Sequence, residues 1–408
     1  MAQRIDLSEI LQQARETGYF DLADFPGLTL SLEQLKELSS LLEKKKIPFG
    51  TASGVNSLTQ QKALRIVNSL RKGVPPPVDV SSFSVGRKNL VDKFDQDLKT
   101  IGQGSSRVRF MNADWGSGKT HSLYLLREIA FRQGFVVSII TLSQDSCPIH
   151  DFMVVYNRIM WNLRTPEERN KPALENVLGK WLQVIKEIGE ERASRIIKIL
   201  PDNLSHALHA YYESVSPVRP NEEKRVLILK YLSGEKVYLR DLRSIGIDSP
   251  INSSNALRML GYMASLFKNL KYRGICILFD EAESIHSFSK SENKDRAYDN
   301  LFHIIQQSQS TPRCYFLYAT TPTLFDNYTP YWPTHRIKDS DIFELEKLSV
   351  AQLQKLSSKL CEIYSIARGA KVPQNIEQRL VNLVSDLSFS DTIGNIVRRC
   401  IAILDEGR

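Results

Sequence analysis

The sequence predicts an α/β protein in which a parallel β-sheet is covered by helices on both faces. Short runs rich in β-branched and aromatic residues recur along the chain, and a helical stretch separates most of them from the next. A phosphate-binding motif follows the first run, which is typical of P-loop proteins. The expected strands are residues 108–112, 135–142, 275–279, 314–319 and 342–345.

Changes in sequence pattern separate the sheet-containing core from helical segments around it. Apolar residues at helical spacing mark the first part of the chain, and a stiff proline run at residues 75–77 precedes the core. More than a hundred residues separate the second strand from the third, and we expect a helical insertion because an unstructured loop of that length is improbable. The expected parts are an N-terminal helical region at 1–55, a helix and connector at 56–82, the core at 83–348 with its insertion at about 150–262, and a C-terminal helical lid at 349–408.

Length and composition are those of an ordinary globular protein. The chain has 408 residues, of which 42% are hydrophobic and 25% charged. It has no apolar run near the roughly 18–20 residues of a membrane-spanning helix, and no signal peptide is visible. The five cysteines are scattered and lack CxxC spacing, which indicates reduced thiols and no zinc framework. We therefore expect a cytoplasmic protein without a membrane partner, and the net charge of +8 is compatible with nucleic acid as a partner.

The first strand leads into a loop of the form G-x-x-x-x-G-K-[ST], and a helix follows. Glycines let such a loop turn so that its backbone N–H groups surround phosphate oxygens, and the helix N-terminus adds a favourable dipole. Lys119 is expected to reach the β- and γ-phosphates, and Thr120 to offer its hydroxyl to Mg²⁺. Ala113 replaces the first glycine, which is tolerable only if that position does not need a positive φ. The expected nucleotide-binding residues here are Asp114, Trp115, Gly116, Ser117, Gly118, Lys119, Thr120 and His121.

The strand at residues 275–279 ends in two carboxylates, Asp280 and Glu281. In a P-loop ATPase the first would hold Mg²⁺, directly or through water, and the second would orient or activate the attacking water. A strand that ends in a polar turn is common by itself, so the phosphate loop upstream is what makes the pair informative. We expect Asp280 to be a metal ligand and Glu281 to be catalytic. Glu283 follows and is a weaker candidate for the same neighbourhood, but we expect it at an exposed position.

Two further positions could complete a catalytic site. The strand at residues 314–319 ends in Thr320 and Thr321, and a hydroxyl there could lie between the acidic pair and the γ-phosphate as a sensor of hydrolysis. Threonines at strand ends also serve as caps. Arg336 precedes the last strand, where oligomeric ATPases often carry an arginine finger that reaches the nucleotide of a neighbouring subunit. A surface arginine is the alternative interpretation of Arg336.

Residues near the two ends of the core could also contact the nucleotide. Val85 and Gly86 lie in the stretch that packs near adenine in this class of protein. Arg398, at the start of a helix in the lid, could fold over the nucleotide, and a solvated helix arginine is the alternative. His206 and His209 lie three residues apart on a helical pattern and are interpreted as structural or exposed.

Several of these segments resemble the P-loop ATP-binding proteins of BREX-type bacteriophage-defence systems, in the AAA+/STAND branch of P-loop ATPases. The resemblance spans about residues 60–400 and is most specific where DWGSGKT is paired with FDEAE. It implies a cytoplasmic ATPase that acts on DNA with partner proteins of a defence operon, often a helicase. Family members usually carry glycine where this chain has Ala113. The matching segments are VGRKNL, NADWGSGKTHSLYLLREIAFRQGFVV, YRGICILFDEAESI, ALRIVNSLRKGVPPP and LKYLSGEKVYLRDLRSIGI.

Two functions fit these observations. The first is Mg²⁺-dependent ATP hydrolysis that drives a conformational change in a defence complex, with ATP and Mg²⁺ as cofactors. The presence of both Asp280 and Glu281 favours hydrolysis, because a degenerate binder would often lose the second carboxylate. The second is a slow nucleotide-dependent switch or loader that assembles with DNA or a helicase. Nucleotide-dependent homo-oligomerisation, DNA binding and the direct partner stay open at this point.

Overall fold

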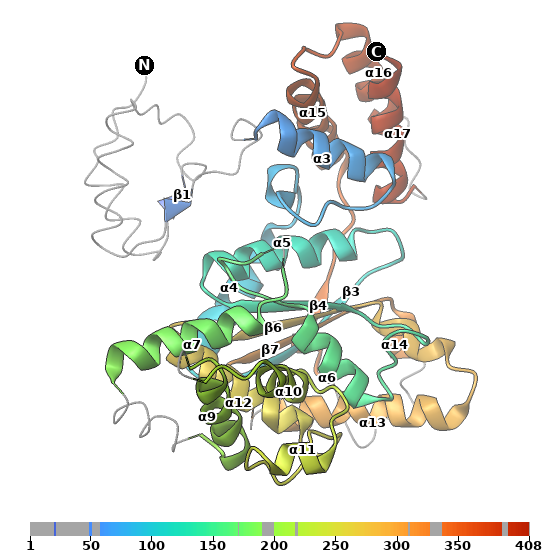
Figure 1. Cartoon of the computed structure of the whole chain (residues 1–408). Coiled ribbons are helices and arrows are strands. Elements are labelled where there is room, and N and C mark those ends of the chain that lie inside the picture. The colour runs from blue at the N-terminus through green and yellow to red at the C-terminus, as the bar shows by residue number, and fades with distance from the viewer. Residues whose placement is uncertain are drawn as a thin grey trace. The chain divides into compact units, whose positions relative to one another are not determined.

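The computed structural model describes seven segments of the chain and one short strand pair. The chain divides into two compact units, one made of Met1–Gly86 and Lys347–Arg408 and the other of Arg87–Glu346 (Figure 1). Strands β1 (Phe20–Asp21) and β2 (Phe49–Gly50) pair in parallel, and the helices predicted in residues 1–55 otherwise lie outside the described residues. The described segments are 58–169, 171–189, 200–216, 219–308, 311–326, 337–385 and 391–407.

The larger unit is built on a six-stranded sheet with the order β5-β4-β6-β7-β3-β8. All neighbouring strands are parallel except β5, which pairs antiparallel with β4. The five predicted strands are confirmed, whereas the two-residue β5 is too short to leave a sequence pattern. The strands are β3 (Arg107–Asn112), β4 (Val136–Thr141), β5 (Leu163–Arg164), β6 (Ile275–Asp280), β7 (Cys314–Thr320) and β8 (Ile342–Glu344).

Helices cover both faces of this sheet, as predicted. Every residue of β6 and β7 is buried, which explains their continuous apolar sequences. Alternate residues of the strands supply two separate cores: Met111 packs with α4 (Lys88–Gly102) and α5 (Lys119–Arg132), whereas Phe110 faces the other layer. Figure 1 shows α4 and α5 on one side of the sheet and the remaining helices of this unit on the other.

The long segment between β4 and β6 is helical, and it packs directly onto the sheet. Its buried residues belong to the same apolar cluster as Phe110, Ile277 and Phe316 of the strands, so the insertion and the sheet share one core. The 3₁₀ helix η4 (Ala282–Ser287) follows β6. The helices on this side are α6 (Phe152–Trp161), α7 (Leu174–Ile188), α9 (Asp202–Ser214), α10 (Glu222–Leu232), α11 (Leu239–Arg243), α12 (Ala256–Asn269), α13 (Ser291–Gln307) and α14 (Thr323–Asp326).

The smaller unit joins helices from opposite ends of the sequence. Helix α3 (Gln60–Arg71) packs against the C-terminal helices, and Figure 1 shows it beside α15 and α17. Arg71 of α3 forms two hydrogen bonds of 2.8 and 2.7 Å with the carboxylate of Asp405, which also accepts one from Tyr364 at 2.8 Å. The C-terminal helices are α15 (Val350–Arg368), α16 (Gln374–Ser385) and α17 (Ile393–Glu406). In the part of the chain that the structure describes, every helix is too short or too polar to cross a membrane.

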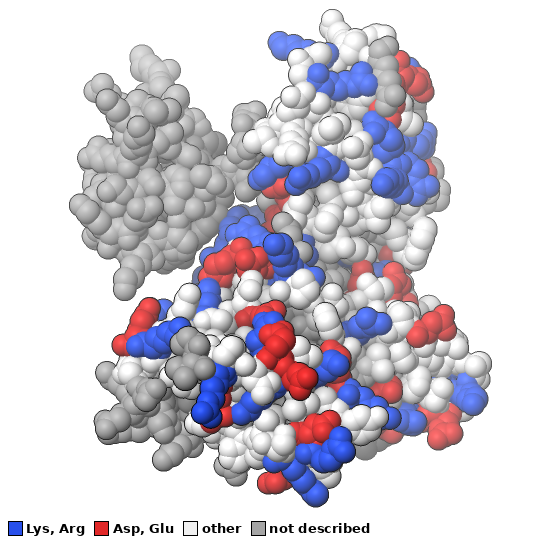
Figure 2. Space-filling model, viewed as in Figure 1, with Lys and Arg blue, Asp and Glu red and all other residues white. Residues whose placement is uncertain are grey.

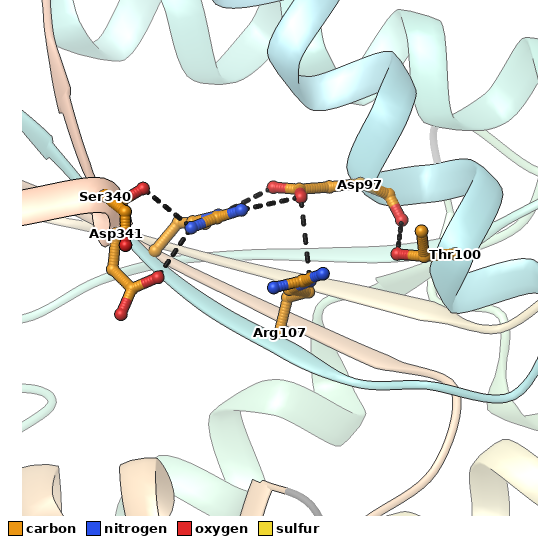
Figure 3. A network of polar contacts seen from close by, with 6 residues as sticks. Asp97, Thr100, Arg107, Ser340 and Asp341 are labelled. Atoms are coloured by element: carbon orange, nitrogen blue, oxygen red, sulfur yellow. Dashed lines mark hydrogen bonds and ion pairs between the residues drawn. The ribbon is translucent and has the colours of Figure 1, made fainter. Parts of the chain in front are cut away.

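A buried ion-pair network fixes the strand that leads into the phosphate loop (Figure 3). Arg109 of β3 donates two hydrogen bonds of 2.8 Å to Asp97 of α4 and a third of 2.6 Å to Asp341 before β8. Asp97 also lies 3.8 Å from Arg107, and its backbone carbonyl accepts a hydrogen bond from Thr100. The pairing with Asp97 raises the pKa of Arg109 above its ordinary value. The network therefore ties α4, β3 and the segment before β8 together.

Removal of this network should destabilise the fold. Asp97→Asn keeps the side-chain size but leaves the mostly buried Arg109 without its bidentate partner, so we expect a loss of about 3 kcal/mol in the free energy of unfolding. Asp92→Asn, at an exposed position on the same helix, should change it by less than about 0.5 kcal/mol. Urea unfolding monitored by circular dichroism measures both, and equal small effects would contradict a structural role for the network.

Candidate nucleotide-binding site

The segment between β3 and α5 forms a tight loop whose glycines adopt the left-handed backbone conformation. Gly116 has a φ of 75° and Gly118 a φ of 96°. Gly118 is the N-cap residue of α5, and no side chain caps this end, so the first N–H groups of the helix are directed at the loop. The described non-glycine residues with positive φ do not include Ala113, whose N–H donates to the carbonyl of Thr320 at 3.1 Å. The methyl of Ala113 is therefore compatible with the loop.

Arg87 stabilises the loop through hydrogen bonds to backbone carbonyls. Its guanidinium donates hydrogen bonds of 2.8 Å to the carbonyls of Ser117 in the loop and Glu346 after β8. Arg87 is buried, and this burial lowers the pKa of its guanidinium to about 10. Sequence reasoning missed this residue, because an arginine beside a predicted adenine-binding stretch carries no signal of what it contacts.

The loop and the end of β6 meet at a hydrogen bond between Thr120 and Asp280. Thr120 Oγ1 lies 2.7 Å from Asp280 Oδ2, and the other carboxylate oxygen accepts the backbone N–H of Glu281 at 3.1 Å. Asp280 is buried, and burial raises the pKa of its carboxyl group although Thr120 and Lys119 oppose that shift. A hydroxyl and a carboxylate are hard oxygen ligands of the kind that Mg²⁺ prefers. These two predicted metal ligands are thus brought together.

Glu281 adopts an unusual backbone conformation, with φ 59° and ψ 42°. This region is unfavourable for residues other than glycine, and such strain is concentrated at functional sites. Burial raises the pKa of its carboxyl group, and the neighbouring Glu283 and Asp280 raise it further. A carboxylate with a raised pKa is a stronger base, which suits the catalytic role predicted for Glu281.

The prediction that Glu283 is exposed is wrong. Its side chain is only 16% exposed, and Oε1 lies 3.6 Å from the ammonium of Lys119. Glu283 is in the first turn of η4, which begins one residue after β6 ends, and this third carboxylate of the acidic segment therefore lies near the loop. Lys119 itself is buried and donates to the carbonyls of Ala113 at 3.2 Å and Asp114 at 3.5 Å.

The order of the strands places the end of β7 between the loop and the acidic pair. Strand β7 lies between β3 and β6, and Thr320 is opposite Asn112 at the start of the loop. Thr320 is fully buried, and its hydroxyl donates to the carbonyl of Thr321 at 3.2 Å. The hydroxyl of Thr321 pairs with that of Thr323 at 2.6 Å. The sensor role of these threonines stays a prediction.

A family model described as BREX system ATP-binding protein BrxC/D matches residues 58–330. The chain belongs to this family. The matched range covers more than half of the chain and includes both the loop and the acidic pair. No curated protein matches the chain. Among solved structures, the ORC2 protein of Aeropyrum pernix (ADPNP-ADP complexes) is similar over 78% of this chain at 13% identity and a TM-score of 0.40, and the similarity spans 61% of that chain.

The remaining site residues predicted for this BREX protein lie in different parts of the chain. Trp115 projects from the loop with 74% exposure, and Asp114 beside it is also exposed. Burial, together with the charge of Arg87, lowers the pKa of His121 to about 3, so this imidazole is neutral at pH 7. Arg336 lies outside the described residues.

Three predicted contacts belong to the smaller unit of the BREX protein. Val85 and Gly86 lie at its boundary with the larger unit. The guanidinium of Arg398 lies against Gly73, where an added Cβ would come within 2.9 Å of Nη2. The roles of Val85, Gly86 and Arg398 near the nucleotide stay predictions.

The loop conformation predicts opposite outcomes for two small substitutions. Gly118→Ala forces a methyl group into left-handed backbone 3.3 Å from Arg87, and it should weaken nucleotide binding and cost about 1–2 kcal/mol of stability. Ala113→Gly should leave binding unchanged and cost only about 0.4–1 kcal/mol, through the entropy of the unfolded chain. Urea unfolding and nucleotide titration measure both. Strongly altered binding by Ala113→Gly would show that the methyl group affects the loop.

Proposed function

We propose that this BREX protein is a Mg²⁺-dependent ATPase that couples ATP binding and hydrolysis to a partner complex acting on DNA. The observation that carries the proposal is the 2.7 Å contact between Thr120 and Asp280, with Glu281 as the next residue. It joins a phosphate-binding loop to a carboxylate pair of the kind that ATP hydrolysis requires. Family membership supports the ATP-binding part of the proposal.

The residues of the loop fit the triphosphate of ATP. The backbone N–H groups at the uncapped start of α5 and in the glycine-rich loop can donate hydrogen bonds to phosphate oxygens, and Lys119 can reach them from the first turn of the helix. Thr120 and Asp280 would hold Mg²⁺, which supplies charge neutralisation at the phosphates when it is bound. Among the described residues, no three acidic, histidine or cysteine side chains converge as a metal site. Magnesium does not need such a cluster, because one or two carboxylates and substrate phosphates commonly suffice.

Glu281 is the candidate catalytic base. It follows the metal-binding carboxylate, and the two neighbouring carboxylates and its own burial raise its pKa. In this position it would orient a water molecule and accept its proton. The alternative function, a slow nucleotide-dependent switch or loader, uses the same loop but not this carboxylate. A substitution of Glu281 therefore separates the two functions.

The charge distribution supports DNA as a partner. The smaller unit, residues 1–86 and 347–408, has nineteen lysines and arginines against fifteen aspartates and glutamates, a net +4. Its positive charge is concentrated in residues 58–86 and 347–408, which contain thirteen basic residues against seven acidic ones. Figure 2 shows lysine and arginine side chains on the visible face of this smaller unit, with fewer acidic ones. Such a surface suits the phosphate backbone of nucleic acid. A helicase from the same operon is the proposed protein partner, and Arg336 could act as a finger between copies of the chain.

Two substitutions should separate binding from turnover. Lys119→Ala removes the cation that meets the phosphates, and we expect ATP binding to weaken at least about tenfold. Glu281→Gln keeps the site intact, and we expect binding to persist while hydrolysis falls by about 10²–10⁴-fold. Calorimetry and phosphate release measure the two quantities, with and without Mg²⁺.

An exposed control residue makes this comparison specific. Glu292→Gln, on α13, should change neither binding nor turnover. Hydrolysis that is absent from the unmodified protein under all DNA and partner conditions would exclude the ATPase and leave the switch. Hydrolysis that survives Glu281→Gln would assign the catalytic base elsewhere.

DNA should bind through its phosphates and raise the rate of hydrolysis. The excess positive charge of residues 58–86 and 347–408 predicts affinity for DNA that falls steeply between about 50 and 200 mM salt. Fluorescence anisotropy with labelled duplex, together with phosphate release at each salt concentration, tests this. Affinity that is independent of salt would contradict a contact with the DNA backbone.

A further inference from the structure

Lys119 has three N–H donors, and three protein oxygens lie near its ammonium nitrogen. The carbonyl oxygens of Ala113 and Asp114 lie 3.2 and 3.5 Å away, and Oε1 of Glu283 lies 3.6 Å away. A phosphate that binds to Lys119 must therefore replace at least one of these contacts. The carbonyls belong to the loop backbone, so Glu283 is the only one of the three partners that is a mobile side chain and carries a full negative charge.

The environment of Glu283 strengthens its contact with Lys119, so this contact competes with the binding of a phosphate to Lys119. Lys119 is 6% and Glu283 16% exposed, so water screens their attraction much less than at the surface. The second carboxylate oxygen of Glu283 is buried and has no hydrogen-bond partner among the residues that the structure describes. Because Lys119 is the cation that partly compensates this carboxylate, Glu283 is held to it and not to another side chain.

The charges around Lys119 also indicate that Glu283 opposes nucleotide binding. Asp280, Glu281 and Glu283 place three carboxylates close to a single ammonium group. Nucleotide phosphates add further negative charge at the same ammonium. Even with full screening by water, two unit charges about 4 Å apart change an equilibrium constant about fivefold. Glu283 is thus expected to oppose nucleotide binding, most strongly when no metal ion neutralises the phosphates.

We propose that Glu283 is a positioning residue that competes with the nucleotide phosphates for Lys119, and so makes tight nucleotide binding dependent on a divalent cation. This inference rests on the proposed ATP site and adds a function for a carboxylate outside the metal-binding and catalytic pair. The protein would then select ATP with its metal over free ATP. Selection arises because the metal lowers the charge repulsion that Glu283 imposes.

The test is the dissociation constant of ATP, measured by calorimetry in EDTA and in excess Mg²⁺. Glu283→Gln should bind ATP at least about fivefold more tightly than the unmodified protein in EDTA, and the gain should be smaller in Mg²⁺. Glu292→Gln removes one exposed charge on the following helix and should leave both constants unchanged. Circular dichroism verifies that each variant is folded.

A second variant tests whether the contact with Lys119 matters apart from the negative charge of Glu283. Glu283→Asp keeps the negative charge but withdraws it from Lys119 by one methylene group, so it should bind ATP in EDTA more tightly than the unmodified protein. Unchanged or weaker binding by Glu283→Gln would overturn the inference, and so would an equal gain with and without Mg²⁺. If the unmodified protein binds no nucleotide in either condition, the proposed ATP site fails instead.

Discussion

The hydrogen bond between Thr120 and Asp280 is the contact around which the site is organised. It joins the first turn of α5 to the end of β6, two segments separated by 160 positions in the chain. For the two side chains to meet, β3 and β6 must end at the same edge of the sheet with β7 between them. The shared core of the insertion and the sheet, and the anchoring of β3 by Arg109, maintain that register.

The site balances charges that oppose one another. Burial raises the pKa of the carboxyl groups of Asp280 and Glu281, whereas Lys119 and the hydroxyl of Thr120 stabilise the ionised form of Asp280. Arg87 is another buried cation, and it donates a hydrogen bond to the carbonyl of Ser117 in the loop. Burial, with a smaller contribution from the charge of Arg87, lowers the pKa of His121. The positive φ of Glu281 adds local strain at the residue proposed to act on water.

In the smaller unit, the position of α3 in the sequence does not predict which helices it packs against. Residues 60–71 precede a proline-rich connector, and the sequence pattern predicts a separate segment before the core. In the structure, α3 packs with the C-terminal helices through Arg71 and Asp405, which are 334 positions apart. The chain thus leaves this unit, forms the sheet and returns, so one helical unit is made from both sides of the core.

The sequence by itself determined the strands, the phosphate loop and the acidic pair, because each depends on local periodicity or on short spacing. Tertiary structure decided what Arg87 and Glu283 contact. Arg87 reaches two carbonyls, one after the end of β8 and one in the loop, and Glu283 lies 3.6 Å from Lys119, which is far from it in the sequence. Side-chain partners that are distant in sequence depend on strand order and register, which only the folded chain specifies.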